Sequence, residues 1–463
     1  MENTKKINLP YNVKDLLKIL NKRGYEAYTV GGAVRDNFLG LEVHDYDITT
    51  NATPQEVCEV FKNYRIIETG LKHGTVTVIY FGVPYEITTY RVDGEYEDNR
   101  HPKSVQFSTD LYDDLSRRDF TINALACDMN GNIVDYFGGI ADLKKKEIKC
   151  VGNPEDRFKE DALRILRALR FASKLGFTIE QKTSESIHKL KYLLKNISAE
   201  RIQKEFNGIL LGQNAKTILR EYKDVFEEFM PTLHLMDLKQ NNRYHKHDTV
   251  YEHTIHVCEN IRQDTILRLA AFFHDFGKPL CYTEEIVDGE VRGHFYGHPS
   301  VSEKITRLIM KDLKYSNAEI ETVCWLVLNH DYQLAETTKS VKKLLNKAPT
   351  IELFDLLLEL READRKDHVY PEGETFASIE KIKAVKEEII AEQECFSLKD
   401  LAVNGYDMMT LGCEGIEIGD ALNFLLEAVI NEKVENKKET LVKYLTCNLS
   451  KYLNRKEGDE DDK

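Results

Sequence analysis

The chain has 463 residues, too many for one hydrophobic core, and this length predicts about three domains. Apolar residues make up 42 % and charged residues 31 % of the sequence, as in an ordinary soluble protein, and no run approaches the ~20 apolar residues of a membrane span. The start of the chain lacks the apolar segment of a signal peptide, and the nine cysteines form no C-x-x-C pair. We therefore expect a cytoplasmic protein without disulfides, a thiolate zinc site or a membrane partner.

The net charge of −14 counts against a nucleic-acid partner for the chain as a whole, because phosphate contacts need Lys and Arg. One segment departs from this average. Residues 157–174 contain the basic side chains Arg157, Lys159, Arg164, Arg167, Arg170 and Lys174 against the acidic Glu160 and Asp161. An acidic chain can therefore still present one basic groove.

Residues 1–150 combine strand and helix patterns, which predicts an α+β domain with a small mixed sheet. Apolar runs of strand length occur at residues 25–30, 75–81 and 85–90. Thr53-Pro54-Gln55-Glu56 predicts a helix start, with an N-cap, a proline at N1 and a glutamate at N3. Asn130-Gly131-Asn132 lies between two short apolar segments and predicts a hairpin turn.

From about residue 155 to about residue 455 the apolar periodicity is helical, which predicts an all-α remainder. Composition shifts near residues 150, 244 and 375 divide the chain into four predicted parts, 1–150, 151–243, 244–374 and 375–463. The final EGDEDDK is typical of a solvated acidic tail.

Residues 31–47, GGAVRDNFLGLEVHDYD, hold the most informative pattern of the chain. Residues i and i+2 of a strand point to the same face, so Asp45 and Asp47 are expected to project into one cleft. Two such carboxylates suit a Mg²⁺ ion that also binds substrate phosphates. Gly31 and Gly32 let backbone N–H groups approach an anion, and Arg35 supplies charge for it. A D-x-D pair alone is usually a solvated strand end, but the glycines and the arginine favour a metal–triphosphate site.

Two further segments carry polar groups suited to a nucleotide. Glu86 lies in an alternating strand pattern, where it is a third carboxylate, the base that deprotonates an attacking hydroxyl, or simply an exposed residue. Arg118, Asp119 and Asn123 belong to RRDFTINA at residues 117–124, and Arg-Arg-Asp before a helix start suits a triphosphate and a sugar hydroxyl. Alone, that cluster could equally be a surface ion-pair group.

Residues 160–171, EDALRILRALRF, are predicted as one helix with Asp161, Arg164 and Arg167 along one side. The plain interpretation is a solvated, salt-bridged helix face. As a base reader, Asp161 would accept a hydrogen bond from an exocyclic amino group and Arg164 would donate to the neighbouring ring nitrogen. Cytosine and adenine satisfy this pair, whereas uracil and guanine leave buried groups unpaired, a loss of roughly 1–3 kcal/mol per group.

These motifs together resemble the class II CCA-adding tRNA nucleotidyltransferases and the bacterial poly(A) polymerases, members of the DNA polymerase β superfamily. GGAVRD, HDYD, RRDFTINA, the DYFGG of residues 135–139 and EDALRILRALRF follow that family's order and spacing over about residues 1–240. The resemblance implies a nucleotidyltransferase head, with Mg²⁺ as cofactor and tRNA, CTP and ATP as partners.

The resemblance also implies a role for each motif residue. Asp45 and Asp47 would hold the metal ions, and Gly32 and Arg35 would contact the triphosphate. The ribose would lie against Arg118 and Asp119. The base would be read by Asp161 and Arg164, with Arg167 and Arg170 completing the nucleotide or primer pocket.

The charged segment at residues 92–107 resembles the flexible loop of the same family, which is shortened in members that add only the two C residues. Its full length here favours CCA addition or A-only addition over CC-only addition. A surface loop without function has the same composition.

The histidines predict a second chemistry. His253, the His274-Asp275 pair and Asp364 all fall in apolar helical segments, where buried imidazoles and carboxylates need partners. A single histidine there is usually a core residue, but four ligand types in this order favour a divalent or transition metal. The order resembles the HD phosphohydrolase superfamily over about residues 244–370. The resemblance implies phosphoester hydrolysis by a metal-bound water, with His298 and His330 as possible ligands of a second ion.

Near the end of the chain, residues 398–429 place glycines before an apolar helix. Helix packing around a glycine-rich turn explains this pattern on residues alone. The segment also resembles the C-terminal tail of the same tRNA enzymes, which implies a helical tRNA-binding tail.

The sequence as a whole predicts template-independent addition of C and A from CTP and ATP to the 3′ end of tRNA, with a metal-dependent phosphohydrolase in the second half. An A-adding enzyme or a poly(A) polymerase is the main alternative, because such enzymes share the head motifs. A hydrolase with an inert head and a pure tRNA-binding module are less favoured, because those motifs are intact.

Overall fold

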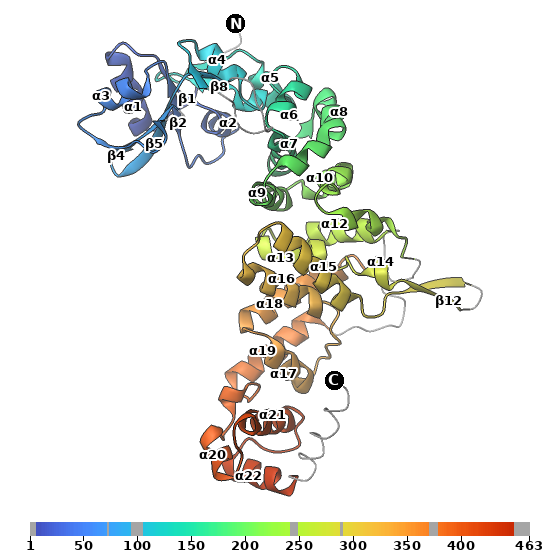
Figure 1. Cartoon of the computed structure of the whole chain (residues 1–463). Helices are drawn as coiled ribbons and strands as arrows, with labels where there is room; N and C mark the ends of the chain where they lie inside the picture. Colours follow the sequence, from blue (N-terminus) through green and yellow to red (C-terminus); the bar gives the residue numbers. More distant parts are fainter. Residues whose placement is uncertain are drawn as a thin grey trace. The chain divides into compact units, whose positions relative to one another are not determined.

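The structure, a computed structural model, describes residues 6–71, 74–93, 105–240, 249–287, 290–369 and 378–448. Its contacts divide the chain into two compact units. One comprises Met1–Leu238, Arg262–Leu269 and Thr306–Ile320, and the other Lys239–Ile261, Ala270–Ile305 and Glu321–Lys463. Figure 1 colours the chain from the N-terminal elements in blue to the C-terminal helices in red.

The N-terminal head mixes strands and helices, as predicted. Its elements are α1 (Tyr11–Lys22), β1 (Ala27–Val30), α2 (Gly32–Leu39), β2 (Asp47–Thr50), α3 (Pro54–Val60), β3 (Arg65–Ile67), β4 (Thr75–Tyr80), β5 (Val83–Thr89), β6 (Arg91–Asp93), β7 (Val105–Phe107), α4 (Leu111–Ser116), η2 (Thr121–Asn123), β8 (Leu125–Cys127), β9 (Ile133–Asp135), α5 (Gly139–Lys145) and β10 (Glu147–Ile148). Most of the predicted loop at 92–107 lies outside the described residues, but its two ends pair as the antiparallel strands β6 and β7.

The head is built on a seven-stranded sheet of order β3-β4-β5-β2-β1-β8-β9. The β2–β5 pair is parallel and the other pairs are antiparallel, which confirms the mixed sheet. Burial alternates along β4, where Val76, Val78 and Tyr80 are buried, so one face of this strand packs into the core. The three predicted strand runs correspond to β1, β4 and β5.

Both predicted local signals in the head form as expected. Thr53 and Glu56 make a reciprocal capping box at the start of α3. The turn at residues 130–132 joins β8 to β9, and Gly131 has a φ of +84°. A methyl group at Gly131 would lie 2.2 Å from the Ile7 carbonyl oxygen, so this turn requires glycine.

The strand expected to carry both aspartates is shorter than predicted. In the register of β1 with β2, Asp47 pairs with Val30, the last residue of β1. The chain then turns at Gly31, which has a φ of +72° and caps α2, so residues before Asp47 find no partner on β1. Asp45 therefore lies just outside the strand, and the i, i+2 geometry of an ideal strand is wrong for this pair.

A helical region follows the head. Its elements are α6 (Pro154–Glu160), α7 (Leu163–Leu175), β11 (Thr178–Ile179), α8 (Gln181–Leu190), η3 (Lys191–Asn196), α9 (Ala199–Leu210), α10 (Ala215–Glu221), α11 (Lys223–Phe226) and η4 (Pro231–Asp237). The predicted continuous helix over residues 160–171 is wrong, because α6 ends at Glu160 and Asp161 is extended, with φ −136° and ψ 103°. The Asp161 side chain instead accepts a hydrogen bond from the N–H of Leu163 at the start of α7, at 3.1 Å.

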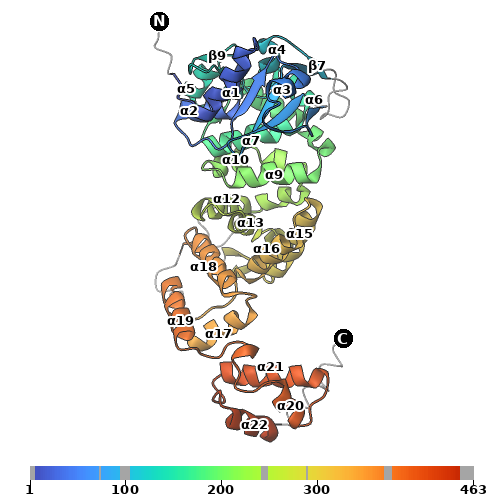
Figure 2. The ribbon, with the colours of Figure 1, turned by 90° about the vertical axis from the view of Figure 1, so that its left-hand side faces the viewer.

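The rest of the chain is mainly helical. Its elements are α12 (Val250–Asn260), α13 (Thr265–Phe273), α14 (Lys278–Cys281), β12 (Thr283–Val287), β13 (Glu290–His294), α15 (His298–Asp312), α16 (Asn317–Asn329), α17 (Thr338–Lys347), α18 (Ile351–Arg365), α19 (Ile379–Ala391), η5 (Leu398–Asp400), α20 (Gly405–Thr410), α21 (Ile416–Ile430) and α22 (Lys438–Cys447). The antiparallel β12–β13 hairpin corrects the expectation of an all-α remainder. Figure 2 shows α20, α21 and α22 grouped at the C-terminal end, where they share one apolar cluster centred on Met408, Leu425 and Leu441.

None of the helices among the described residues combines the length and the apolar character that crossing a membrane requires. All nine cysteines are free; eight of them are buried or partly buried, and Cys447 is exposed.

The DYFGG segment forms a hydrogen-bonded turn at the start of α5. The carboxylate of Asp135 accepts hydrogen bonds from the N–H groups of residues 137–140, at 2.8–3.2 Å, and thereby fixes the start of α5. This turn presses Gly139 against η2 of the RRDFTINA motif. A methyl group at Gly139 would lie 2.2 Å from the Thr121 carbonyl oxygen.

Gly139→Ala is therefore expected to lower the free energy of unfolding by about 1–3 kcal/mol, because the backbone of η2 must move away. Urea unfolding measures the effect. Gly419→Ala is the matched control, since it lies within α21 with no atom within 4 Å of the added methyl group, and it is expected to be neutral or stabilising by up to about 1 kcal/mol. Equal unfolding curves for the two variants would contradict the close contact at Gly139.

Candidate functional site

A groove of about 450 Å³ opens at the start of β2. Its walls are formed by Gly32, Ala33, Asp36, Leu41, Glu42, Val43, His44, Asp45, Asp47, Lys174 and Leu175. Asp45 and Asp47 thus share one groove, although only Asp47 belongs to the strand. Glu86 is exposed on β5. Because Ile48 of β2 pairs with Ile87 of β5 in parallel, the residues before them, Asp47 and Glu86, are neighbours across the two strands.

The electrostatics of the two aspartates suit a cation. Burial and the neighbouring charge of Asp45 raise the pKa of Asp47, while the guanidinium of Arg118 opposes them. A divalent cation between two carboxylates removes the repulsion between their charges. Mg²⁺ prefers oxygen ligands, which both aspartates supply. The residues present therefore fit the implied metal.

Arg118 contacts Gly31, the residue before Gly32 of the groove wall. A methyl group at Gly31 would lie 3.0 Å from Nη1 of Arg118, in a backbone conformation that already favours glycine. The N–H of Gly31 donates to the Leu125 carbonyl at 3.1 Å, so this group is used within the protein. Gly32 and Ala33 begin α2 and line the groove, where the first N–H groups of a helix lack partners within the helix.

A chain of buried hydrogen bonds links the predicted nucleotide residues. Nη1 of Arg35 donates to Oδ1 of Asn123 at 2.6 Å, and Nδ2 of Asn123 donates to Asp119 at 3.1 Å. The other oxygen of Asp119 accepts from Nε and Nη2 of Arg167, at 2.8 and 2.5 Å. Burial would raise the pKa of Asp119, but Arg167 outweighs it and holds this pKa below its usual range. The structure thus brings Arg35, Asn123, Asp119 and Arg167 into one network.

Three arginines of this region lie around the ring of Phe171 in α7. The guanidinium carbons of Arg35, Arg167 and Arg170 lie 5.0, 5.4 and 4.3 Å from its ring centroid. Arg170 also donates to Glu205 of α9 at 2.5 Å. These contacts explain how the basic segment forms a compact surface within an acidic chain.

Asp161 and Arg164, the predicted base reader, do not form the i, i+3 pair of one helix. Asp161 accepts from Nη2 of Arg201 at 3.0 Å. Arg164 is buried and donates to Glu160 at 2.7 Å and to the carbonyl oxygens of Arg157 and Arg117 at 3.2 and 2.9 Å. Each of the two side chains is therefore held by a partner of opposite charge.

Sequence reasoning missed Asp114, a fully buried carboxylate of α4. One of its oxygens accepts from Nε and Nη2 of Arg117, at 3.0 and 2.6 Å. The other accepts from Nη2 of Arg118 at 3.1 Å and from Oγ1 of Thr49 in β2 at 3.3 Å. The spacing of three and four residues ahead of two arginines was the available signal. Lys174, which lines the groove, was noted only as part of a basic run.

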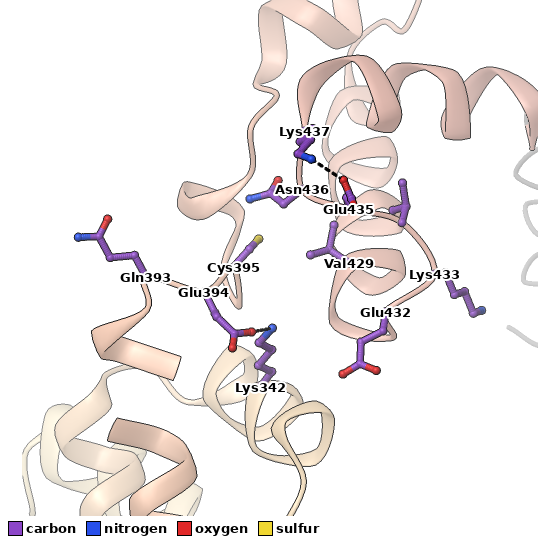
Figure 3. A pocket seen from close by; sticks show the side chains of 11 residues that line it. Lys342, Gln393, Glu394, Cys395, Val429, Glu432, Lys433, Glu435, Asn436 and Lys437 are labelled. Atoms are coloured by element: carbon purple, nitrogen blue, oxygen red, sulfur yellow. Dashed lines mark ion pairs between the residues drawn. The ribbon is translucent and has the colours of Figure 1, made fainter. Parts of the chain in front are cut away.

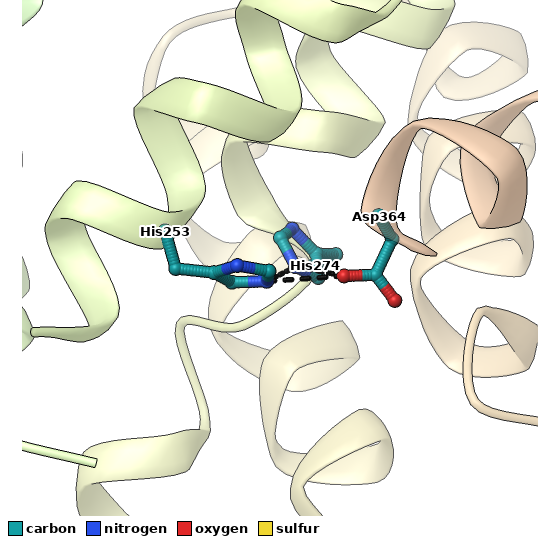
Figure 4. Close-up of side chains that lie close together, drawn as sticks. All are labelled: His253, His274 and Asp364. Atoms are coloured by element: carbon teal, nitrogen blue, oxygen red, sulfur yellow. Dashed lines mark hydrogen bonds and ion pairs between the residues drawn. The ribbon is translucent and has the colours of Figure 1, made fainter. Parts of the chain in front are cut away.

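The histidine segments converge on a second, buried cluster. Figure 4 shows His253 of α12, His274 just after α13 and Asp364 of α18 pointing toward one another. Nε2 of His253 lies 3.0 Å from Asp364 and 3.3 Å from Nε2 of His274. His298, the first residue of α15, and His330, just after α16, form a second group in which their Nε2 atoms are 3.1 Å apart.

Asp275 lies between the two groups and faces both. Its Oδ2 is 3.1 and 3.4 Å from Nε2 of His274 and His253, and its Oδ1 is 3.3 and 3.7 Å from Nε2 of His298 and His330. All six residues predicted as metal ligands, His253, His274, Asp275, His298, His330 and Asp364, therefore meet in one place, in two sets of possible ligands.

The ring orientations test whether this set fits a metal. Nδ1 of His274, His298 and His330 each lies 2.7–2.9 Å from a backbone carbonyl oxygen, of Ala271, Phe295 and Val327 respectively. A carbonyl oxygen only accepts, so each Nδ1 carries the proton and each Nε2 turns its lone pair to the centre. Two lone pairs about 3 Å apart repel unless a proton or a cation lies between them. Imidazole nitrogens with shared carboxylates fit transition-metal ions better than Mg²⁺.

Two residues around this cluster escaped the sequence analysis. Asp367 is buried, and its Oδ2 lies 2.7 Å from Nδ1 of His253. Together with Asp364 it counteracts the effect of burial and raises the pKa of His253 to about 9. Lys278 places its Nζ 2.7 Å from Oδ2 of Asp275. Both lie three residues after a predicted ligand, a helical spacing that could have indicated them.

Figure 3 shows another cavity, of about 610 Å³, near the C-terminal helices. It is lined by Lys342, Gln393, Glu394, Cys395, Val429, Glu432, Lys433, Val434, Glu435, Asn436 and Lys437. Lys342 pairs with Glu394 and Lys437 pairs with Glu435, and its three lysines are matched by three glutamates. This balance gives the cavity no preference for an anion, and it contains no predicted site residue.

Asp114→Asn is expected to lower the free energy of unfolding by about 2–4 kcal/mol at pH 7, because the two arginines lose a buried counter-charge. Burial would raise the pKa of Asp114, but Arg118 and Arg117 outweigh it and hold the pKa below its usual range. The stabilisation is therefore complete above the unfolded-chain pKa of about 3.9 and is lost as the pH falls through the lower folded-state value.

Urea unfolding between pH 7 and pH 3 measures this difference for the protein and the variant. The difference between their free energies of unfolding should stay constant down to about pH 5 and then decrease. A difference that increases in acid would show that Asp114 is not the ionised partner of these arginines.

Three family models match separate parts of the chain. They are the poly A polymerase head domain over residues 27–149, the probable RNA and SrmB-binding site of polymerase A over residues 176–235, and a putative domain 2 of tRNA nucleotidyltransferase over residues 295–445. The first covers β1 to β9 and α5, including every predicted nucleotide residue of the head.

Solved and curated relatives agree with these matches. The CCA-adding enzyme of Ligilactobacillus salivarius is 49 % identical over 220 residues, and the chain spans only about half, 54 %, of its length. The Bacillus stearothermophilus CCA-adding enzyme in complex with CTP has a TM-score of 0.66 and 28 % identity over 98 % of both chains. The Bacillus pumilus CCA-adding enzyme is 34 % identical over 434 residues, 93 % of this chain and 96 % of that one. By this full-length similarity and by the groove that its residues form, the chain belongs to the CCA-adding enzyme family.

Proposed function

We propose that this chain adds C, C and A to the 3′ end of tRNA, using CTP and ATP without a nucleic-acid template. The observation that carries the proposal is the groove in which Asp45 and Asp47 lie opposite the start of α2, beside the buried Arg35–Asn123–Asp119–Arg167 network. The CTP complex of the Bacillus stearothermophilus relative supports the choice of substrate.

In this proposal the groove positions two reactants and stabilises charge. Mg²⁺ bound by Asp45 and Asp47 would supply Lewis-acid stabilisation of the triphosphate and would favour the attacking 3′-hydroxylate. Arg118, held by Asp114 against Gly31, places positive charge at the β2 end of the groove. Glu86, next to Asp47 in register, is suited to accept the proton of the RNA hydroxyl.

Base choice would be made by Asp161 and Arg164. Asp161 would accept from the amino group of cytosine or adenine, and Arg164 would donate to the adjacent ring nitrogen. Uracil and guanine present a carbonyl and a ring N–H at these places, which both side chains would reject. Arg167 is fixed by Asp119 and so would connect the sugar contact to the base contact.

The proposal predicts three additions and then a stop. Purified protein is incubated with tRNA that ends at the discriminator base, with CTP and ATP singly and together, and the products are resolved at single nucleotides. C, C and A should be added when both nucleotides are present, and Asp47→Asn should reduce the rate by at least about 10³-fold because the metal loses a ligand. A ladder of A residues would identify a poly(A) polymerase, and A addition only to tRNA ending in CC would identify an A-adding enzyme.

We also propose that the histidine cluster is an HD-type phosphohydrolase centre that binds two divalent or transition-metal ions. The observation that favours this second function is the convergence of four imidazole Nε2 atoms on Asp275 and Asp364, with the Nδ1 protons of three of the rings engaged elsewhere. Bound ions would lower the pKa of a water and so supply the nucleophile for a phosphoester. Cyclic 2′,3′-phosphates and 2′- or 3′-phosphates of RNA ends are the proposed substrates.

Asp275→Asn should abolish hydrolysis of a 2′,3′-cyclic nucleotide and lower the bound metal, measured by elemental analysis after loading with Mn²⁺, because the variant loses the shared carboxylate. Nucleotide addition should be unchanged, since none of these residues lines the groove at β2. Asp331→Asn is the control, since Asp331 follows His330 in the sequence but is exposed. Unchanged metal content in Asp275→Asn, or loss of both activities, would contradict two separate centres.

A further inference from the structure

The base-reading carboxylate of Asp161 is held from two sides. Its Oδ1 accepts from the N–H of Leu163 at 3.1 Å, and its Oδ2 accepts from Nη2 of Arg201 at 3.0 Å. Asp161 is in an extended conformation between α6 and α7, so no helix fixes its backbone. Its side chain direction therefore depends on these two hydrogen bonds.

Arg201 reaches Asp161 from α9, a helix that follows 40 residues later in the chain. The same face of α9 carries Glu205, which binds Arg170, and Gly208, where a methyl group would lie 2.4 Å from Cδ of Arg170. These contacts pack α9 closely against α7, so Arg201 is presented to Asp161 by a rigid neighbour. The paired side chains are 26 % and 19 % exposed, a setting in which a charge-assisted hydrogen bond is only partly screened.

Nη1 of Arg201 is buried and has no hydrogen-bond partner among the residues that the structure describes. A buried donor without an acceptor is unfavourable, so stability alone does not explain why Arg201 lies here. Its hydrogen bond to Asp161, one of the proposed base-reading residues, offers a functional reason for this position.

We propose that Arg201 is a positioning residue that determines base specificity by fixing the orientation of Asp161. The inference rests on the proposed nucleotide addition and adds a residue to it. With Arg201 in place, the carboxylate faces the amino group of cytosine or adenine and repels the carbonyl of uracil or guanine. Without it, Asp161 is free to turn away, so the correct base loses a hydrogen bond and the wrong base loses a repulsion.

The test compares CTP with UTP on tRNA that ends at the discriminator base, by kcat/KM for the first addition. In Arg201→Gln, the value for CTP should fall about tenfold while that for UTP falls little or rises, so the preference for C over U drops by about tenfold or more. Arg201→Lys keeps a positive partner and should retain most of the preference. Lys204→Gln, an exposed substitution on the same helix, is the matched control and should change neither value.

A double-mutant cycle shows whether Arg201 acts through Asp161. In an Asp161→Ala background, Arg201→Gln should change the preference no further, because the group that it positions is already gone. A merely structural role would lower both kcat/KM values equally and leave their ratio unchanged, and that result would overturn the inference. Failure of the unsubstituted protein to add C and A would instead overturn the proposed function.

Discussion

The arrangement of the proposed nucleotide site depends on the carboxylate of Asp119, which connects its residues through hydrogen bonds. It is buried, and it accepts hydrogen bonds from its own neighbour Phe120, from Asn123 and from Arg167. A buried charge with fewer partners would be too costly to keep ionised. Because Asn123 in turn binds Arg35, one carboxylate locks α2, η2 and α7 together. Helix α2, which begins at Gly32, and helix α7, which carries Arg164 of the proposed base reader, are thus set in a fixed relation.

The same network also explains how an acidic protein holds a group of basic side chains in fixed positions. Arg35, Arg167 and Arg170 lie around the ring of Phe171, and each is paired with a carboxylate. Cations held in this way lose little conformational entropy when a polyanion binds. The overall charge of −14 therefore says little about the partner of this one region.

How far the sequence predicted the structure depended on the range of the interactions. Local patterns were reliable: the capping box at Thr53, the turn at Gly131 and the strand runs of the sheet all formed as expected. The order of the histidines and aspartates identified His253, His274, Asp275 and Asp364, which do meet, and the resemblance to the HD superfamily added His298 and His330 to the same cluster. The sequence analysis does not predict the β12–β13 hairpin, although the sequence between the two strands contains Asp-Gly, a dipeptide that favours two-residue turns.

Predictions failed where a distant partner decides the local conformation. Asp45 was placed on a strand, but β1 ends opposite Asp47 and leaves nothing for it to pair with. Asp161 is predicted within a helix, but its side chain accepts hydrogen bonds from the N–H of Leu163 and from Arg201, 40 residues away. Asp114 and Asp367 bind the predicted site residues Arg118 and His253, and such supporting carboxylates have no motif of their own.

The contact between Gly31 and Arg118 has a consequence for how this site can vary. A methyl group at Gly31 would lie only 3.0 Å from Nη1 of Arg118, closer than an ordinary contact. A larger residue at position 31 therefore requires the guanidinium of Arg118 to shift, and with it the positive charge that acts on Asp47. The two positions are 87 residues apart in the sequence, and a redesign of one has to take the other into account.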